Sequence, residues 1–309
     1  KLMWILLAFI SATLLGLYDT SKKYSLRGND VIPVLFLNTL FCSLIFLPLI
    51  LLSQYTNLLD GSLLHVGFGG WEMHRWIVLK SLIVLLSWVF GYFAIAHLPL
   101  TIVGPINATR PVMTLVGAMV VFGERLNGWQ WAGVGLAILS VFLLAGSGKK
   151  EVIDFKHNRW IFFLVLAALM GTCSGLLDKF LMASPEDGGV GLDRMMTQSW
   201  YNSYQCLMMG VVFFIYVVGR KRKKTTLSFS WKWSILLISV FLSMADFAYF
   251  YALSIPGAMI SIVSMVRRGS VLVSFLCGAL LFKEHNLKAK ALYLCFVLLG
   301  MIFLWIGSH

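Results

Sequence analysis

Apolar runs of about 20 residues recur from one end of this chain to the other, with short polar breaks between them. A helix needs about 20 apolar residues to cross the ~30 Å hydrocarbon layer of a bilayer. Each run is predicted to be helical, because unpaired backbone N–H and C=O groups are not tolerated in lipid. The sequence therefore predicts an all-α membrane protein with ten transmembrane helices. The expected spans are residues 2–24, 31–53, 75–97, 100–122, 128–146, 159–182, 195–218, 231–253, 257–282 and 288–307.

Composition agrees with a lipid environment. Of the 309 residues, 59% are hydrophobic and 12% are charged, whereas about 25% of an average soluble domain is charged. The formal net charge of +12 does not indicate nucleic acid, because the basic residues lie in short breaks between apolar runs. The five cysteines lie inside apolar runs with no metal-like spacing, so we expect neither a bound metal nor a cofactor.

Basic residues gather in alternate loops. Positive charge is retained on the cytoplasmic side, so the count places these odd-numbered loops in the cytoplasm and both termini outside. We expect a multi-pass protein of the inner, or plasma, membrane. The basic residues of the odd-numbered loops are Lys22, Lys23, Arg27, Lys149, Lys150, Lys156, Arg159, Arg220, Lys221, Arg222, Lys223, Lys224, Lys232, Lys283, Lys288 and Lys290.

The two halves of the chain repeat each other. Phe93–Pro99 has a counterpart in Phe250–Pro256, and Val121–Arg125 has one in Leu281–His285. Residues 1–148 and 149–309 are therefore predicted to be two five-helix repeats. Because five is odd, the second repeat enters the membrane from the opposite side, as in transporters whose site lies between inverted repeats. Further matches in the same order are Trp4 with Trp160, Lys23 with Lys179, Asn38 with Asn202, and Cys42 with Cys206.

Two segments carry a family resemblance. Phe122–Leu126 followed by Trp129–Gly133, with an echo at Phe282–Glu284, resembles the drug/metabolite transporter superfamily in the form of two EamA-like domains. The resemblance covers essentially the whole chain and implies a transporter with both termini in the cytoplasm. The basic residues of this chain indicate the opposite orientation, which we keep as the prediction.

Within that superfamily, Val266–Ser274 is similar to the ninth helix of the sugar-phosphate and nucleotide-sugar branch. In that branch a Lys-Arg pair contacts substrate phosphate. Arg267 stands at the lysine position and Arg268 at the arginine position, so the motif departs by one residue. The resemblance implies that this pair contacts an anionic substrate group.

Ionisable residues also lie deep inside the predicted spans, where an uncompensated charge costs several kcal/mol. One interpretation is a positive pocket for an anionic group, because guanidinium binds phosphate or carboxylate through paired hydrogen bonds. The alternative is internal ion pairing, of Asp246 with an arginine and of Asp178 with Lys179. Asp246 can also carry a proton coupled to transport. Besides Arg267 and Arg268, the candidates are Arg110, Lys179 and Asp246.

The seventh predicted span begins with an unusually polar stretch. Gln198, Tyr201, Asn202 and Gln205 share one helical face, and we expect this face to line the cavity. The alternative is hydrogen bonding between helices, which such residues also provide. Asn38 is a weaker candidate of the same kind. Asp19 and Lys22 lie near a helix end, where we expect them to be solvated.

These observations favour a secondary active transporter, working as an exchanger, symporter or exporter, that moves a small organic anion by alternating access around a central basic site. The motif allows this anion to be phosphorylated. One alternative is an exporter of amino acids or other neutral or zwitterionic metabolites. Another is a membrane enzyme or lipid-carrier-handling protein, disfavoured because no acid/base or metal constellation accompanies the basic residues. The expected partners are the substrate and the lipid bilayer, without nucleic acid, for a monomer or homodimer.

Overall fold

The computed structural model describes residues 3–110, 113, 127–148, 158–182, 185, 189–222, 228–254, 266–267, 269–282 and 287–307. Within these residues the regular secondary structure is entirely helical, as predicted. The helices are α1 (Met3–Ser25), α2 (Val31–Tyr55), α3 (Trp71–His97), α4 (Leu100–Ala108), α6 (Gly128–Gly148), α7 (Arg159–Met182), α8 (Arg194–Arg222), α9 (Trp233–Ser254), α11 (Ser270–Leu281) and α12 (Leu287–Gly307).

In the described part of the chain, five segments are long and apolar enough to span a bilayer. They are α1, α2, α3, Arg159–Asp178 of α7 and Arg194–Lys221 of α8. Shorter apolar segments lie in α9, at Trp233–Tyr249, and in α11. The chain is therefore a multi-pass membrane protein.

The helix boundaries follow the apolar runs with local differences. α3 begins at Trp71 rather than at residue 75, so that Glu72 and His74 continue the helix beyond the apolar run. α3 ends at His97 and α4 begins at Leu100, on either side of Pro99, which has no N–H to donate. Much of the predicted spans 100–122 and 257–282 lies outside the described residues, as do Phe122–Leu126 and residues 283–286.

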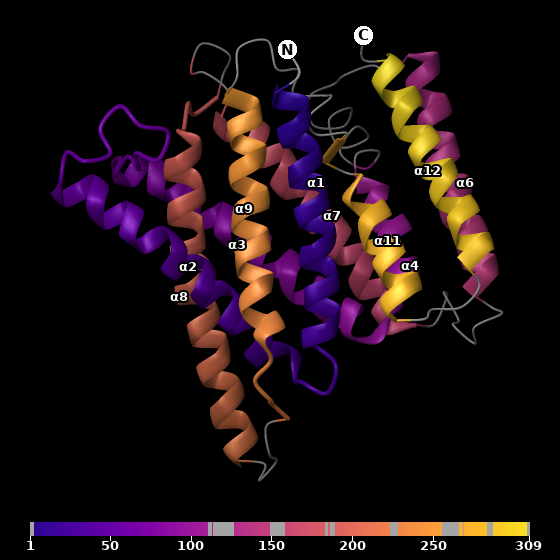
Figure 1. Ribbon diagram of the computed structural model, residues 1–309, viewed down its shortest axis with the longest axis horizontal. Coiled ribbons are helices and arrows are strands. Elements are labelled where there is room, and N and C mark those ends of the chain that lie inside the picture. The colour runs from indigo at the N-terminus through magenta and orange to yellow at the C-terminus, as the bar shows by residue number, and fades with distance from the viewer. Residues whose placement is uncertain are drawn as a thin grey trace.

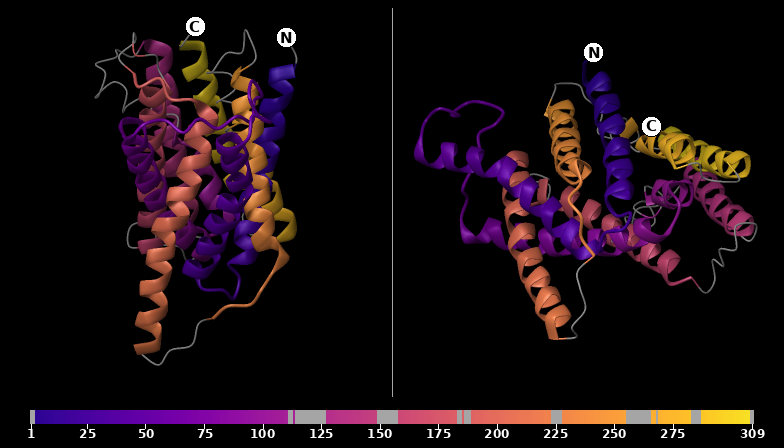
Figure 2. Two further views of the ribbon diagram at one scale, coloured as in Figure 1. Left: turned by 90° about the vertical axis from the view of Figure 1, so that its left-hand side faces the viewer. Right: turned by 60° about the horizontal axis from the view of Figure 1, so that its bottom comes forward.

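The helices stand side by side in one bundle (Figure 1). α1 packs against α9, α3 against α7, and α2 against α8. α4 packs against α11, while α6 and α12 pair with each other at one edge of the bundle (Figures 1 and 2). Helices from the first and second halves of the chain are thus interleaved rather than separated.

Most of the larger helix contacts are related by an exchange of the two halves, although the α4–α12 and α2–α3 contacts have no counterpart of similar extent among the described residues. Matching helices in order pairs α1 with α7, α2 with α8, α3 with α9, α4 with α11, and α6 with α12. Under this exchange the α1–α9 contact becomes the α7–α3 contact, and α2–α9 becomes α8–α3. The α1–α11 contact becomes the α7–α4 contact. The exchange leaves three contacts unchanged, because each joins a helix to its own counterpart: α2–α8, α4–α11 and α6–α12.

Side-chain hydrogen bonds lie at the exchanged contacts. Ser11 of α1 donates to the Ala245 carbonyl of α9 over 2.6 Å, and Ser87 of α3 donates to the Ala167 carbonyl of α7 over 2.8 Å, so that the donor and acceptor helices are reversed between these two bonds. The Ser239 hydroxyl of α9 donates to the Asn38 carbonyl of α2 at 3.2 Å. Its exchange-related counterpart is a 3.3 Å bond from Ser81 of α3 to the Tyr201 carbonyl of α8.

Candidate functional site

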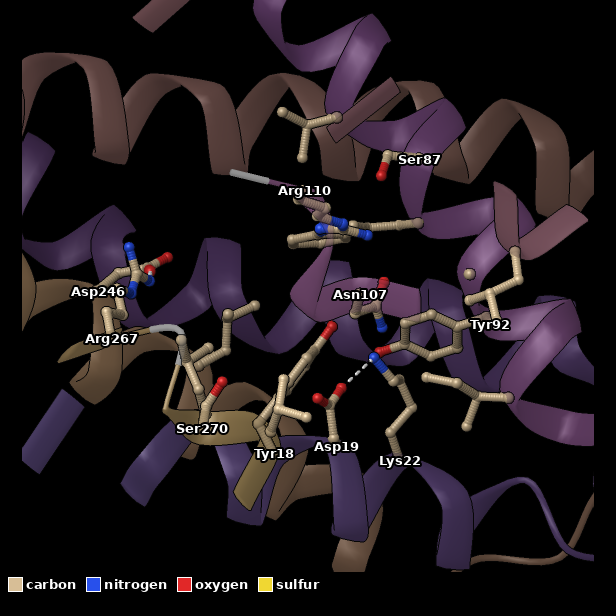
Figure 3. Close-up of a pocket in the computed structure, with 18 of the residues that line it drawn as sticks. Tyr18, Asp19, Lys22, Ser87, Tyr92, Asn107, Arg110, Asp246, Arg267 and Ser270 are labelled. Atoms are coloured by element: carbon tan, nitrogen blue, oxygen red, sulfur yellow. Dashed lines mark hydrogen bonds and ion pairs between the residues drawn. The ribbon is translucent and has the colours of Figure 1, made fainter. Parts of the chain in front are cut away.

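A cavity of about 300 Å³ lies within the bundle, lined by residues from α1, α3, α4, α7, α8, α9 and α11 (Figure 3). This volume is at the lower end of pockets that hold small molecules. Among the described residues that line it are three basic side chains and two acidic ones: Lys22, Arg110, Arg267, Asp19 and Asp246. In an apolar bundle, this concentration of charge marks the cavity as the candidate site.

Arg267 and Asp246 form an ion pair at one end of the cavity (Figure 3). The Tyr201 hydroxyl donates to the second carboxylate oxygen of Asp246 at 3.3 Å. The Arg267 guanidinium also lies 4.2 Å from the ring centroid of Tyr249, a favourable cation–π geometry. Three sequence candidates therefore meet in one network, and the expected pairing of Asp246 with an arginine is observed for Arg267.

Arg110 lies over the centre of the cavity in Figure 3, directly after α4. One of its nitrogens donates to the Ala167 carbonyl of α7 at 3.4 Å. The Arg110 guanidinium packs against Gly171 of α7. A Cβ at Gly171 would lie 2.9 Å from Nη1 and 3.0 Å from Cζ of Arg110, so the absence of a side chain makes room for the guanidinium.

Lys22 and Asp19 form a second ion pair in the cavity, with 2.8 Å between Nζ and Oδ1. Tyr18 and Tyr92 place their rings beside the Lys22 ammonium. The expectation that this pair is solvated at a helix end is wrong for Lys22, whose side chain is 8% exposed. The last turn of α1 lies inside the bundle, covered by α3, which the sequence of α1 alone does not reveal.

The polar face of α8 divides between two environments. Tyr201 lines the cavity, but Gln198, Asn202 and Gln205 are not among its lining residues. These three side chains are buried, and Asn202 donates to the Gln198 carbonyl at 2.8 Å. Asn38 is also buried away from the cavity, and its side-chain oxygen accepts from Ser239 at 3.1 Å.

Two sequence candidates cannot be placed against the cavity. Arg268 lies outside the described residues, and of Lys179 only the helical backbone is described. Its neighbour Asp178 pairs with Lys80 of α3, a residue that the sequence analysis did not single out. A lysine inside a predicted span is itself a signal of a buried charge, and Lys80 is 6% exposed. Its ammonium lies 5.3 Å from the ring centroid of Tyr201.

One end of the bundle is tied together just beyond Lys22. Here the α1–α2 connection is hydrogen-bonded to the α8–α9 connection. The Asp30 N–H donates to the Ser228 carbonyl at 2.7 Å, and the Ser230 N–H donates to the Asn29 side chain at 2.7 Å. Arg220 forms an ion pair with Asp30 at 3.3 Å. We call residues 28–30 and 228–230 the end clasp.

A second cavity, of about 400 Å³, lies where the α2–α3 connection meets the start of α8. Phe247 and Tyr251 of α9 line it together with His65, Asp193 and Arg194. Asp246 and Tyr249 line the central cavity instead, so α9 separates the two spaces. Among the described residues, no three His, Cys, Asp or Glu side chains are grouped so as to hold a metal ion.

An all-helical bundle with apolar helices and a charged central cavity defines a multi-pass membrane protein. Residues 2–146 match the EamA-like transporter family. This match covers the first half of the chain and agrees with the resemblance seen in the sequence.

Similarities to individual proteins add to this match. A solved structure described as "Crystal structure of protein" has the same overall fold, with a TM-score of 0.61 and 12% identity. The match covers 98% of this chain and 97% of that one. A curated relative is the probable 4-amino-4-deoxy-L-arabinose-phosphoundecaprenol flippase subunit ArnE of Pectobacterium atrosepticum, which is 27% identical over 71 residues. That match spans 23% of this chain and 63% of the relative.

Proposed function

We propose that this protein is a secondary active transporter that carries a small organic anion across the inner membrane through the central cavity. The observation that carries the proposal is the convergence of Arg110 and Arg267 on one cavity. Cationic side chains at this depth are costly unless they face a cavity or a counter-charge. Guanidinium groups in a low-dielectric space suit phosphate or carboxylate.

We further propose that residues 1–148 and 149–309 are two inverted five-helix repeats, with ten spans in all. The support is the exchange relation among the helix contacts, which pairs α1–α9 with α7–α3. The matched hydrogen bonds of Ser239 and Ser81 add to it. Rocking of inverted repeats around a central site gives alternating access, and transport would then expose the cavity at each end in turn.

In this mechanism the ion pair of Arg267 and Asp246 is the part that responds to substrate. An anion that reaches Arg267 competes with the Asp246 carboxylate for the guanidinium, while Arg110 approaches the same anion from the opposite wall. Asp246 retains the Tyr201 hydroxyl as a donor, and once released from Arg267 it is the group that would carry a coupled proton. Arg268 and Lys179 remain proposed contacts.

The test is a thermal-shift screen of the purified protein in detergent against sugar phosphates, nucleotides, carboxylates and amino acids. Arg267→Gln alone leaves the Asp246 carboxylate buried without its cation, so the informative variant is Arg267→Gln/Asp246→Asn. It removes both charges; Asn keeps the shape of Asp246, and Gln keeps a polar side chain, shorter than arginine, at position 267. We expect stabilisation by one anionic class in the wild type and its loss in the double variant.

The matched control is Arg75→Gln, because Arg75 is 54% exposed and pairs with Glu72 away from the cavity. Uptake of the stabilising compound into proteoliposomes should fall in the double variant and stay unchanged in the control. Stabilisation by neutral or zwitterionic compounds alone, equal in the double variant, would contradict an anion site at Arg267. It would favour the export of uncharged metabolites.

A second candidate is the movement of a phosphorylated lipid carrier. The similarity to the ArnE flippase subunit favours it, as does the second cavity, where Arg194 lies near Phe247 and Tyr251. An aromatic wall beside a cation suits a headgroup with an attached lipid chain. Stabilisation by polyprenyl phosphate, but not by water-soluble phosphates, would support this candidate over the first.

A further inference from the structure

The environment of the Lys22 ammonium has a chemistry of its own. The Asp19 carboxylate is 2.8 Å away, and the ring centroids of Tyr18 and Tyr92 are 4.1 Å and 5.1 Å away. A carboxylate combined with aromatic faces is the arrangement that binds alkylammonium groups. Figure 3 shows this group at the opposite end of the cavity from Arg267 and Asp246.

The contacts of Lys22 differ from those of the next residue. Lys23 donates to the Ile95 and Leu98 carbonyls, each at 2.6 Å, and so ties α1 to the end of α3. The ion pair of Lys22 is made within α1 itself. Its flexible four-carbon stem lets the ammonium leave without breaking a hydrogen bond or ion pair between helices, although the cation–π contact with Tyr92 of α3 is lost. Lys23 is thus a structural residue and Lys22 is placed to move.

We propose that Asp19, Tyr18 and Tyr92 form a subsite for the primary ammonium group of a substrate, and that Lys22 occupies this subsite while it is empty. The inference rests on the proposed function, because the anionic group of the same substrate would lie toward Arg110 and Arg267. The substrate class is then a small organic anion that carries a primary amine at its other end. Such a molecule would displace Lys22 from Asp19 and Arg267 from Asp246.

A matched ligand pair tests the subsite. Glucosamine 6-phosphate and glucose 6-phosphate differ in an amine and a hydroxyl, so the ratio of their affinities isolates the ammonium contact. We expect the wild-type protein to bind the amine about tenfold more tightly, the effect of one charge-assisted contact. Asp19→Asn should abolish the preference, and Lys22→Met should increase it by removing the tethered competitor. Lys23→Met, the matched control, should leave the ratio unchanged.

A third ligand separates the subsite from the anion site. Ethylammonium chloride has no anionic group on its organic part, and it should stabilise Lys22→Met but not Lys22→Met/Asp19→Asn. If this occurs while neither sugar phosphate binds any variant, the subsite stands and the anion function fails. Equal wild-type affinities for the two sugars, or equal weakening of both by Lys22→Met, would overturn the proposal. The second result would make Lys22 an anion contact instead.

Discussion

Gly171 shows how a single residue shapes the cavity, because its missing side chain is what lets the Arg110 guanidinium lie flat on α7. In Gly171→Ala the new Cβ would come within 3.0 Å of that group, so Arg110 must move. We expect binding of the stabilising anion to weaken about tenfold, with little change in the thermal midpoint of the ligand-free protein. Isothermal titration in detergent measures both variants against the wild type.

Gly175→Ala is the control for this prediction. Gly175 lies one turn further along the same helix, and a Cβ there meets nothing within 4 Å. Equal weakening in the two variants would mean that α7 tolerates no added methyl group and that Arg110 is not the cause.

Lys80 and Asp178 give a second prediction at the scale of residues. Lys80→Met leaves Asp178 without its cation, and the Asp178 side chain is 36% exposed, so water compensates part of the loss. We expect a loss of about 1–3 kcal/mol, below the cost of breaking a fully buried pair. Lys80→Met/Asp178→Asn should recover most of it. Thermal unfolding in detergent checks the pair, and failure of the double variant to recover would show that the lysine packs rather than pairs.

At the scale of elements, the approach of α1 to α11 depends on Gly16. A Cβ at this position would lie 2.4 Å from Cβ of Val273 and 2.9 Å from the Ser270 carbonyl oxygen. Small residues allow such close packing between membrane helices. Gly16→Ala should therefore destabilise the protein by about 1–3 kcal/mol, the usual cost of overpacking, measured by thermal unfolding.

Val273→Ala tests whether the two helices cause this effect. Combined with Gly16→Ala, it should restore part of the stability, because it removes Cγ1 of Val273, 2.6 Å from the new Cβ, while Cβ of Val273 remains. Gly135→Ala is the control, since a Cβ there meets nothing within 4 Å. No recovery in the combined variant would place the strain at Cβ of Val273 or at the Ser270 carbonyl instead.

At the scale of the whole molecule, the end clasp ties the α1–α2 and α8–α9 connections together just beyond Lys22. In the proposed alternating access, this end of the bundle must open. In a background with the five native cysteines replaced, Asn29→Cys/Ser230→Cys can be joined by a short bifunctional thiol reagent. We expect the joined protein to keep ligand binding but to lose transport into proteoliposomes. Each single cysteine variant, treated in the same way, should transport normally. Undiminished transport after complete cross-linking would show that this end does not open.

The apolar runs by themselves determined that the chain is an all-helical membrane protein, because lipid leaves the backbone no alternative to helices. The order of matched residues likewise predicted two related halves, and Arg267, Asp246 and Arg110 were identifiable as charges too deep to be solvated. Hydropathy assigns each residue to a span but not to a face. It therefore could not show that Lys22 is buried, that Lys80 is the partner of Asp178, or that Gln198 and Gln205 lie away from the cavity. Those outcomes depend on which helices interleave, α1 with α9 and α3 with α7, and only the tertiary structure decided that packing.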